Sequence, residues 1–235
     1  MGEAAAEVTG AREGRGQRRQ KGRGAPNPLL QYAAICGLVA MALTLWVGGS
    51  GAPLPGDVWL ARRVQEAPGM GDLARGVNAA GDWPWQFAVV TVSATAIWFH
   101  RERRRRRKEA LLALAAALAL LLWDQLLKAI VRSPRPAADF GIRVDYLRDS
   151  YGFPSGHVYS DVVVYGTIAV FAGSFLPKWW AMALRAAVLA LLVLAGPARV
   201  YVGAHWPSDV IGGYLWGAAA LLMAVAFGRW AAKRA

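Results

Sequence analysis

A helix start that carries an imidazole lies at Pro154-Ser155-Gly156-His157, directly before an apolar run. Serine is a favoured N-cap, and glycine lets backbone N–H groups approach an anion closely. Because a helix N-terminus favours anions, His157 would stand beside a bound phosphoryl group, where it could give or take a proton. Many helices start with these residues only because they cap the helix. Residues elsewhere in the chain must therefore decide between a helix cap and a phosphate-binding site.

Two other polar stretches supply groups that would complete phosphate chemistry. Lys128 and Arg135 lie on one of them, and Arg199, His205 and Asp209 lie on the other. Cations neutralise charge on the phosphate oxygens, and cations near a bilayer need an anionic partner of this kind. His205 can attack phosphorus while Asp209 accepts a hydrogen bond from its second ring nitrogen. Asp209 could instead only cap the helix that follows it.

The proton balance of such a transfer gives His157 a role. It would protonate the leaving oxygen and then activate the water that releases phosphate. Asp161 lies one helical turn further on and is a candidate to influence the imidazole of His157. These residues together predict phosphoryl transfer to water.

The spacing within the three stretches resembles the tripartite signature of the type 2 phosphatidic acid phosphatase family. The matching residues are Lys128, six residues and Arg135-Pro136, then Pro154-Ser155-Gly156-His157, then Arg199, five residues, His205, three residues and Asp209. The resemblance covers the chain from about residue 57 onward.

This resemblance implies a metal-independent lipid phosphatase that uses no cofactor. In it His205 would be the nucleophile, Asp209 its partner and His157 the general acid. Five residues would hold the phosphate, namely Lys128, Arg135, Ser155, Gly156 and Arg199. Ala198 departs from the pattern, because the family usually has serine before the third-motif arginine. The lost hydroxyl could weaken phosphate binding but removes no proton-transfer role.

Composition predicts a polytopic membrane protein. Among 235 residues, 56% are hydrophobic and 11 are Trp, which is too apolar for an ordinary soluble domain. The net charge of +12 could suggest nucleic-acid binding, but two basic clusters, at residues 12–23 and 101–108, abut hydrophobic runs as cytoplasmic flanks do. We therefore expect no nucleic-acid partner. The single cysteine, Cys36, lies in an apolar run and provides neither a disulfide framework nor a thiolate metal site.

The expected fold is all-α, a helical bundle with six transmembrane helices. Residues 1–27 are predicted to form a disordered basic cytoplasmic tail, and residues 28–235 the membrane domain. The predicted spans are residues 29–47, 83–99, 110–127, 154–175, 179–195 and 210–227. A short interfacial helix is expected around Val58 to Val64, Gly196-Pro197 is expected to end the fifth span, and Asp124 is expected to pair with Lys128.

The distribution of basic residues predicts the orientation. With both termini inside, inner segments hold 17 basic residues and outer segments hold 9. The protein is thus expected to be a multi-pass cell-membrane protein with cytoplasmic termini. The three motif stretches would then meet at the non-cytoplasmic face.

Several readings stay open at this point. The substrate could be a polyprenyl diphosphate, phosphatidic acid, phosphatidylglycerophosphate or diacylglycerol diphosphate. A non-catalytic binder or transporter of phosphorylated lipids would keep the cations but could dispense with one imidazole. A vanadate-dependent haloperoxidase resembles the same motifs, but that architecture is soluble and six apolar stretches argue against it. The expected partners are the bilayer and a lipid phosphate, and the sequence leaves the oligomeric state open.

Overall fold

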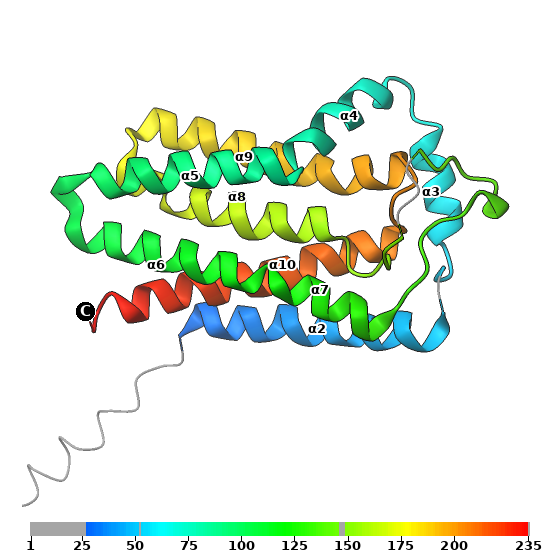
Figure 1. The fold of residues 1–235 in the computed structure, drawn as a ribbon, viewed down its shortest axis with the longest axis horizontal. Helices are drawn as coiled ribbons and strands as arrows, with labels where there is room; N and C mark the ends of the chain where they lie inside the picture. The colour runs from blue at the N-terminus through cyan, green and yellow to red at the C-terminus, as the bar shows by residue number, and fades with distance from the viewer. Residues whose placement is uncertain (1–26, 52, 146–148, 235) are drawn as a thin grey trace, which may run out of the picture.

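The computed structural model describes residues 27–51, 53–145 and 149–234. Within these ranges the chain is helical and has no strand, which confirms the all-α prediction. The long helices run roughly along one axis (Figure 1). The helices are α2 (Pro28–Ser50), α3 (Asp57–Gln65), α4 (Met70–Ala80), α5 (Trp83–Phe99), α6 (Arg104–Leu120), α7 (Leu122–Val131), α8 (Gly156–Phe175), α9 (Lys178–Tyr201) and α10 (Pro207–Ala231), with 3-10 turns at Arg101–Arg103 and Ala138–Phe140.

Helix α10 lies at the centre of the bundle and packs most extensively against α2, α6 and α8. Two glycines four residues apart let α8 approach it. A Cβ at Gly213 would lie 2.8 Å from the carbonyl oxygen of Ser155, and one at Gly217 would lie 2.9 Å from Cβ of Val162. Small residues at this spacing are what close helix packing in a membrane requires. The starts of α8 and α10, which carry motif residues, are therefore held together.

Helix α9 does not end at Gly196-Pro197, which corrects the predicted end of the fifth span. It continues to Tyr201 with Pro197 inside it. The hydroxyl of Tyr214 on α10 accepts the N–H of Gly196 at 2.9 Å and donates to the carbonyl of Leu192. In a regular helix this N–H would donate directly to this carbonyl. The Tyr214 hydroxyl therefore replaces one backbone hydrogen bond of α9 next to the proline. The extension carries the third-motif arginine to the end of the bundle.

The predicted third span is divided into α6 and α7 at Leu121. The N–H of Leu121 bonds the carbonyl of Leu118 at 3.2 Å, so the ladder tightens there for one turn. The carbonyl of Leu120 accepts the hydroxyl of Tyr159 on α8 at 2.6 Å. A side chain from the neighbouring helix thus satisfies a backbone group that the change in pitch leaves available.

The segment between α2 and α5 contains two helices rather than one. Helix α3 matches the predicted interfacial helix, whereas α4 was not predicted. Both pack against α9, α4 more extensively than α3. They therefore cover the end of the bundle where α9 finishes, as Figure 1 shows.

Five helical segments among the described residues are long and apolar enough to cross a membrane. They are Pro28–Ser50, Arg104–Val131, Gly156–Phe175, Lys178–Tyr201 and Pro207–Ala231. The sixth predicted span is α5, whose 17 residues stand at the lower limit of about 17–25 for a transmembrane helix. The count of six spans stays a prediction.

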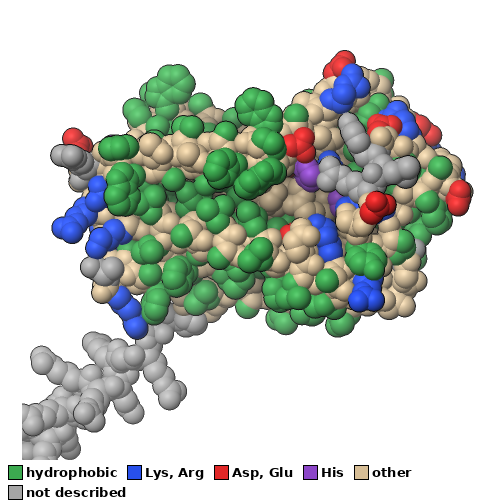
Figure 2. Space-filling model, in the orientation of Figure 1, with side chains coloured by type: hydrophobic (Ala, Val, Ile, Leu, Met, Phe, Trp, Pro, Cys, Tyr) green, Lys and Arg blue, Asp and Glu red, His purple; other side chains and the backbone are tan. Residues whose placement is uncertain are grey.

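The polarity of the exposed side chains changes along the axis of the bundle. Figure 2 shows an apolar middle, with Lys and Arg side chains gathered at the end where the chain finishes. The start of α6 and the end of α10 lie at this end (Figure 1), and both are rich in basic residues. The predicted tail falls almost entirely on residues 1–26, which lie outside the described residues.

Candidate active site

The three motif stretches meet at the opposite end of the bundle, around a cavity of about 320 Å³. Helices α5, α7 and α8 and the turn before α10 form its walls. Five of the eight predicted site residues line it, namely Lys128, Arg135, Gly156, His157 and His205. Ser155, Arg199 and Asp209 are buried behind this lining. Figure 2 shows histidine, acidic and basic side chains together where the apolar middle ends.

His205 lies between a cation and a carboxylate. Its Nε2 is 3.2 Å from Nη1 of Arg135, and its Nδ1 is 3.5 Å from Oδ2 of Asp209. The same Oδ2 accepts the backbone N–H of Trp206 at 3.0 Å, so Asp209 caps α10 and faces the imidazole as well. The cap expected from the sequence is confirmed, and the role of Asp209 as partner of a nucleophilic His205 stays a prediction. With Nδ1 turned to the carboxylate, Nε2 is the ring nitrogen on the cavity side.

The environment of His205 favours its neutral form. The side chain is 2% exposed, and burial lowers its pKa well below the usual 6.5. The positive charges of Arg199, Arg135 and Lys128 lower this pKa further, as does His157. In the neutral form with its proton on Nδ1, the imidazole carries a lone pair on Nε2, which faces Nη1 of Arg135.

Arg135 is held by three hydrogen bonds to two residues. Its Nε donates to the carbonyl of Ser150 at 2.6 Å, and its Nη2 donates to the hydroxyl of Ser150 at 2.9 Å. Its Nη1 donates to the carbonyl of Ala204 at 2.6 Å. These bonds fix the planar guanidinium beside His205, where Arg135 lines the cavity.

Lys128 pairs with Asp124 one turn earlier on α7, as predicted. Gly156, the first residue of α8, lies directly against this pair. A Cβ there would be 2.6 Å from both Nζ of Lys128 and Oδ2 of Asp124. Any larger residue would push the cation away, so the absence of a side chain at this position lets the helix N-terminus and the ammonium group face the same small volume.

Arg199 is buried behind His205 and is oriented by Asn78 on α4. Its Nη1 donates to Oδ1 of Asn78 at 3.2 Å, and Nδ2 of Asn78 donates to the carbonyl of Ala198 at 3.5 Å. The side chain of Ala198 belongs to a buried apolar cluster that includes Val158 and Val200. The position where a serine was expected therefore needs no hydroxyl partner.

His157 contacts a carboxylate that sequence analysis missed. Its Nε2 lies 2.9 Å from Oδ1 of Asp82, at the junction of α4 and α5. Asp161, the candidate from the sequence, is bound instead by Nε2 of Gln86 at 2.8 Å. A Cβ at Gly81 would lie 3.2 Å from the His157 ring and 3.1 Å from Asp161, so both side chains pack against that glycine.

The first turn of α10 is capped from α3. Oδ1 of Asp57 accepts the N–H of Ser208 at 2.9 Å, and Oδ2 accepts its hydroxyl at 2.7 Å. Ser155 joins the same assembly, because its N–H donates to the carbonyl of Asp209 at 2.9 Å. Its buried hydroxyl has no hydrogen-bond partner in the described part of the chain, and a phosphate oxygen would supply one.

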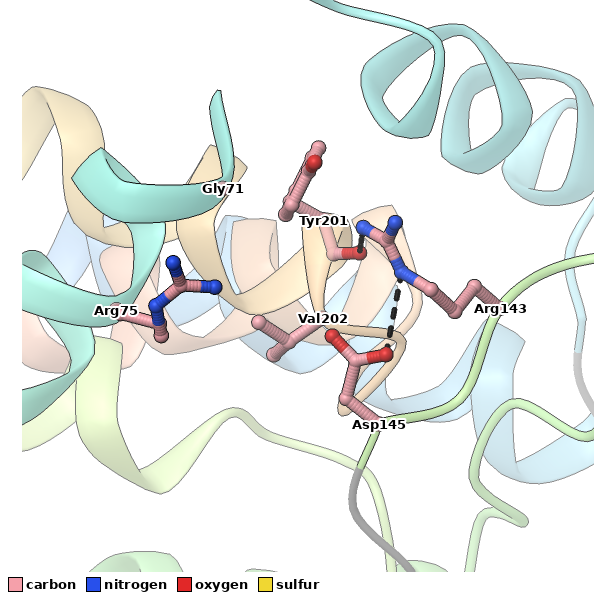
Figure 3. A pocket seen from close by; sticks show the side chains of 6 residues that line it. All are labelled: Gly71, Arg75, Arg143, Asp145, Tyr201 and Val202. Atoms are coloured by element: carbon pink, nitrogen blue, oxygen red, sulfur yellow. Dashed lines mark hydrogen bonds and ion pairs between the residues drawn. The ribbon is translucent and has the colours of Figure 1, made fainter. Parts of the chain in front are cut away.

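The connection between α7 and α8 is tied to the turn between α9 and α10 beside a second cavity, of about 420 Å³ (Figure 3). Arg143 donates from Nη2 to the carbonyl of Tyr201 at 3.1 Å and lies 4.3 Å from its ring centroid. The N–H of Asp145 donates to the carbonyl of Val202 at 3.0 Å. Gly203 has a φ of 66°, and a Cβ there would be 2.0 Å from the Arg143 carbonyl. Only glycine permits this approach.

The chain is similar to several known proteins. The family model of the PAP2 superfamily matches residues 108–233, a range that contains all eight predicted site residues. Phosphatidylglycerophosphatase B of Bacillus subtilis is 36% identical over 95 residues, which are 40% of this chain and 45% of that protein. The undecaprenyl-diphosphatase of Sulfolobus acidocaldarius is 43% identical over 68 residues, 28% of this chain and 29% of that protein. These matches span less than half the length of either relative.

A solved structure shows a similar fold. The crystal structure of a transmembrane PAP2 type phosphatidylglycerolphosphate phosphatase from Bacillus subtilis superposes with a TM-score of 0.67 and 21% sequence identity. The superposition covers 81% of this chain and 94% of that chain. The bundle is therefore one that a membrane phosphatase adopts along nearly its full length.

Proposed function

Because the chain belongs to the PAP2 superfamily, we propose that it is an integral-membrane lipid phosphatase that works through a phospho-histidine intermediate. The observation that carries the proposal is the position of His205. Its Nε2 faces the cavity next to Arg135, and its Nδ1 faces Asp209. A neutral, oriented imidazole among cations is what attack on a phosphate ester requires.

In the first step, the lone pair of His205 Nε2 forms a bond to phosphorus. The bond from phosphorus to the lipid oxygen breaks, and the leaving oxygen takes a proton from His157. Asp209 stabilises the positive charge that develops on the phosphorylated ring. The phosphate oxygens would be held by Lys128, Arg135 and Arg199, by the hydroxyl of Ser155 and by the backbone N–H groups at Gly156.

In the second step, His157 takes a proton from water as the water oxygen attacks phosphorus. The bond from phosphorus to Nε2 breaks, which returns neutral His205 and releases inorganic phosphate. His157 is again protonated and ready for the next ester. Neither step needs a metal or a redox partner, so the proposed enzyme uses no cofactor.

The proposed substrate class is a phosphomonoester or diphosphate of a lipid. Two of this chain's relatives are named for phosphatidylglycerophosphate and undecaprenyl diphosphate, which are both lipids with a terminal phosphate group. The cavity has an apolar side that suits such a molecule. Trp83, which is 72% exposed, and Leu121 line it next to the cations. The lipid chain would leave the cavity on that side, into the bilayer.

We further propose that the termini are cytoplasmic and the site extracytoplasmic. The cluster at residues 101–108 and the basic C-terminal residues belong to the end of the bundle opposite the cavity (Figure 1). Basic residues are retained on the cytoplasmic side of membrane proteins. A cysteine placed at exposed Asp72 should then react with an impermeant maleimide in intact cells, whereas one at Lys233 should react only after lysis, tested in a Cys36→Ala background.

The activity is tested with purified protein in detergent containing EDTA. Phosphate release is measured from a polyprenyl diphosphate, phosphatidic acid and phosphatidylglycerophosphate, with His205→Ala alongside. Release that disappears in the variant and persists in EDTA supports the histidine phosphatase, and the order of rates identifies the preferred lipid. If wild-type protein binds these lipids but releases no phosphate, the alternative of a non-catalytic binder or transporter replaces this proposal.

A further inference from the structure

The carboxylate of Asp82 is placed to act on His157. Its Oδ1 lies 2.9 Å from Nε2 of the imidazole, although 75 positions separate the two residues. The contact joins the junction of α4 and α5 to the second residue of α8. It therefore depends on tertiary packing and is not a local helical pair.

Asp82 contacts the imidazole from a position at which an acid usually caps its own helix. Asp82 is the N-cap residue of α5, with Pro84 in the first turn, a position where Asp ordinarily accepts backbone N–H groups of its own helix. Its side chain makes no such capping bond within the described residues. The carboxylate is directed at the imidazole instead, so the capping role does not explain why an acid occupies this position.

The second acid near His157 is engaged elsewhere. Asp161 is 1% exposed and accepts the amide of Gln86, which also donates to the hydroxyl of Ser160 at 2.8 Å. Gln86 thus holds Asp161 within a polar cluster of α5 and α8. Among the described residues, the other charged or titratable side chains that line the same cavity as the imidazole are Asp124, Lys128, Arg135 and His205.

We propose that Asp82 is a positioning residue for the general acid: it accepts the Nε2–H of His157 and holds the imidazolium ready to donate its other proton. The proposal rests on the proposed function. The proton on Nδ1 would pass to the leaving oxygen as the bond from phosphorus to that oxygen breaks. The Nε2–H stays with the ring throughout, so no proton passes to Asp82. The carboxylate thereby fixes the ring and compensates its charge, as the aspartate does in a serine-protease triad.

The test uses the dependence of rate on the leaving group. An alkyl phosphate needs a proton on its leaving oxygen, whereas the phenolate of nitrophenyl phosphate departs without one. The quantity compared is kcat/KM, which reports the steps up to departure of the leaving group. Asp82→Ala should reduce kcat/KM for the alkyl ester by about 10–100-fold, the range found when the orienting partner of a metal-bound histidine is removed. Its effect on the nitrophenyl ester should be less than about threefold.

Asp72→Asn is the matched control. This acid is on α4, close to Asp82 in the chain, and pairs with Arg75 at the surface away from the imidazole. It should leave both substrates unaffected. Asp82→Glu, which keeps the carboxylate, should recover part of the alkyl-ester activity, and His157→Gln should show the same selective loss as Asp82→Ala.

The outcomes separate this inference from the proposed function. Equal losses on both esters in Asp82→Ala would show a general structural role, and no loss on either would show that the contact has no function. Either result overturns the inference while leaving the phosphatase intact. A wild-type protein that releases no phosphate from these two esters or from the three lipids named above would overturn the proposed function and this inference with it.

Discussion

The hydroxyl of Tyr214 accepts the backbone N–H of Gly196 at 2.9 Å, which places an α10 side chain inside the hydrogen-bond ladder of α9. The contact lies one residue before Pro197 and three before Arg199. A proline inside a helix removes a backbone donor and normally weakens or ends it. Here a side chain from the central helix compensates, so the path of the chain to the buried arginine depends on a tertiary contact.

Tyr214→Phe tests this bridge. This substitution removes the hydroxyl but keeps the ring. The N–H of Gly196 and the carbonyl of Leu192 then lose their hydrogen bonds to that hydroxyl. An unsatisfied backbone group of this kind costs about 1–3 kcal/mol. We expect a lower thermal midpoint in detergent and reduced phosphate release. Tyr32→Phe, at an exposed position on α2, is the control and should change neither. An unaltered midpoint in Tyr214→Phe would mean that the helix tolerates the break by itself.

Asp209→Asn separates the two roles of that carboxylate. An amide oxygen can still cap the N–H of Trp206, but the ionisable carboxyl group beside His205 is lost. We therefore expect thermal stability close to wild type and phosphate release reduced by at least about tenfold. Asp57→Asn provides the comparison, because Asp57 caps the same helix through Ser208 without facing the imidazole. Equal loss of activity in both variants would assign Asp209 to capping alone.

His157→Gln should uncouple the two chemical steps on nitrophenyl phosphate. Phosphorylation of His205 proceeds because the phenolate leaves unaided, but the water that releases phosphate has lost its base. We expect a burst of nitrophenolate close to one equivalent per enzyme, followed by a slow steady rate, measured by stopped-flow absorbance. Linear release without a burst would contradict the role of His157 in the second step.

The pH dependence of stability should report His205. Its pKa is depressed in the folded protein, while the unfolded chain has the usual 6.5. Below pH 6.5 the unfolded state takes up a proton on this histidine that the folded state does not. The contribution of His205 to the free energy of unfolding is therefore fully present above pH 6.5 and declines as the pH falls towards the folded-state pKa. The decline is at most about 1.4 kcal/mol per pH unit. Thermal midpoints measured between neutral and acid pH should fall more steeply for wild type than for His205→Gln, and identical slopes would contradict the assignment.

Gly213→Ala should destabilise the bundle. The added Cβ would be 2.8 Å from the Ser155 carbonyl, so α8 and α10 must separate at the turn that carries the site. Overpacking of this kind costs about 1–3 kcal/mol. Gly37→Ala on α2 is the matched control, because nothing lies within 4 Å of a Cβ at that position. We expect a lower midpoint and lower activity only in the first variant, and equal midpoints would show that the two helices can move apart without loss.

Local patterns predicted the parts of the site that lie within one segment. The pairing of Asp124 with Lys128 follows from their spacing on one helix, and the cap at Asp209 follows from its place before an apolar run. Long-range partners carry no such signal. Asp82 and Asn78 meet His157 and Arg199 across 75 and 121 positions, so only the packing of α4 and α5 brings them there.

The same distinction explains the helix boundaries. Helix α4 was missed because its short, glycine-containing sequence resembles a loop, and packing against α9 stabilises it. The end of α9 was misplaced because Gly196-Pro197 is a local stop signal that a distant tyrosine overrides. An acid directly before Trp83-Pro84 is a typical helix start, and nothing near it in the sequence indicates that the carboxylate faces a histidine.

The cationic groups around the cavity already hold ligands from the protein itself. Lys128 binds Asp124, and Arg135 binds Ser150 and the Ala204 carbonyl. In the proposed enzyme, an entering phosphate would exchange places with these internal ligands. Such an exchange would lower the affinity for free inorganic phosphate, because a tethered group of the protein would replace each departing anion. Product inhibition would thereby be limited, and Asp124 would neutralise Lys128 again after each turnover.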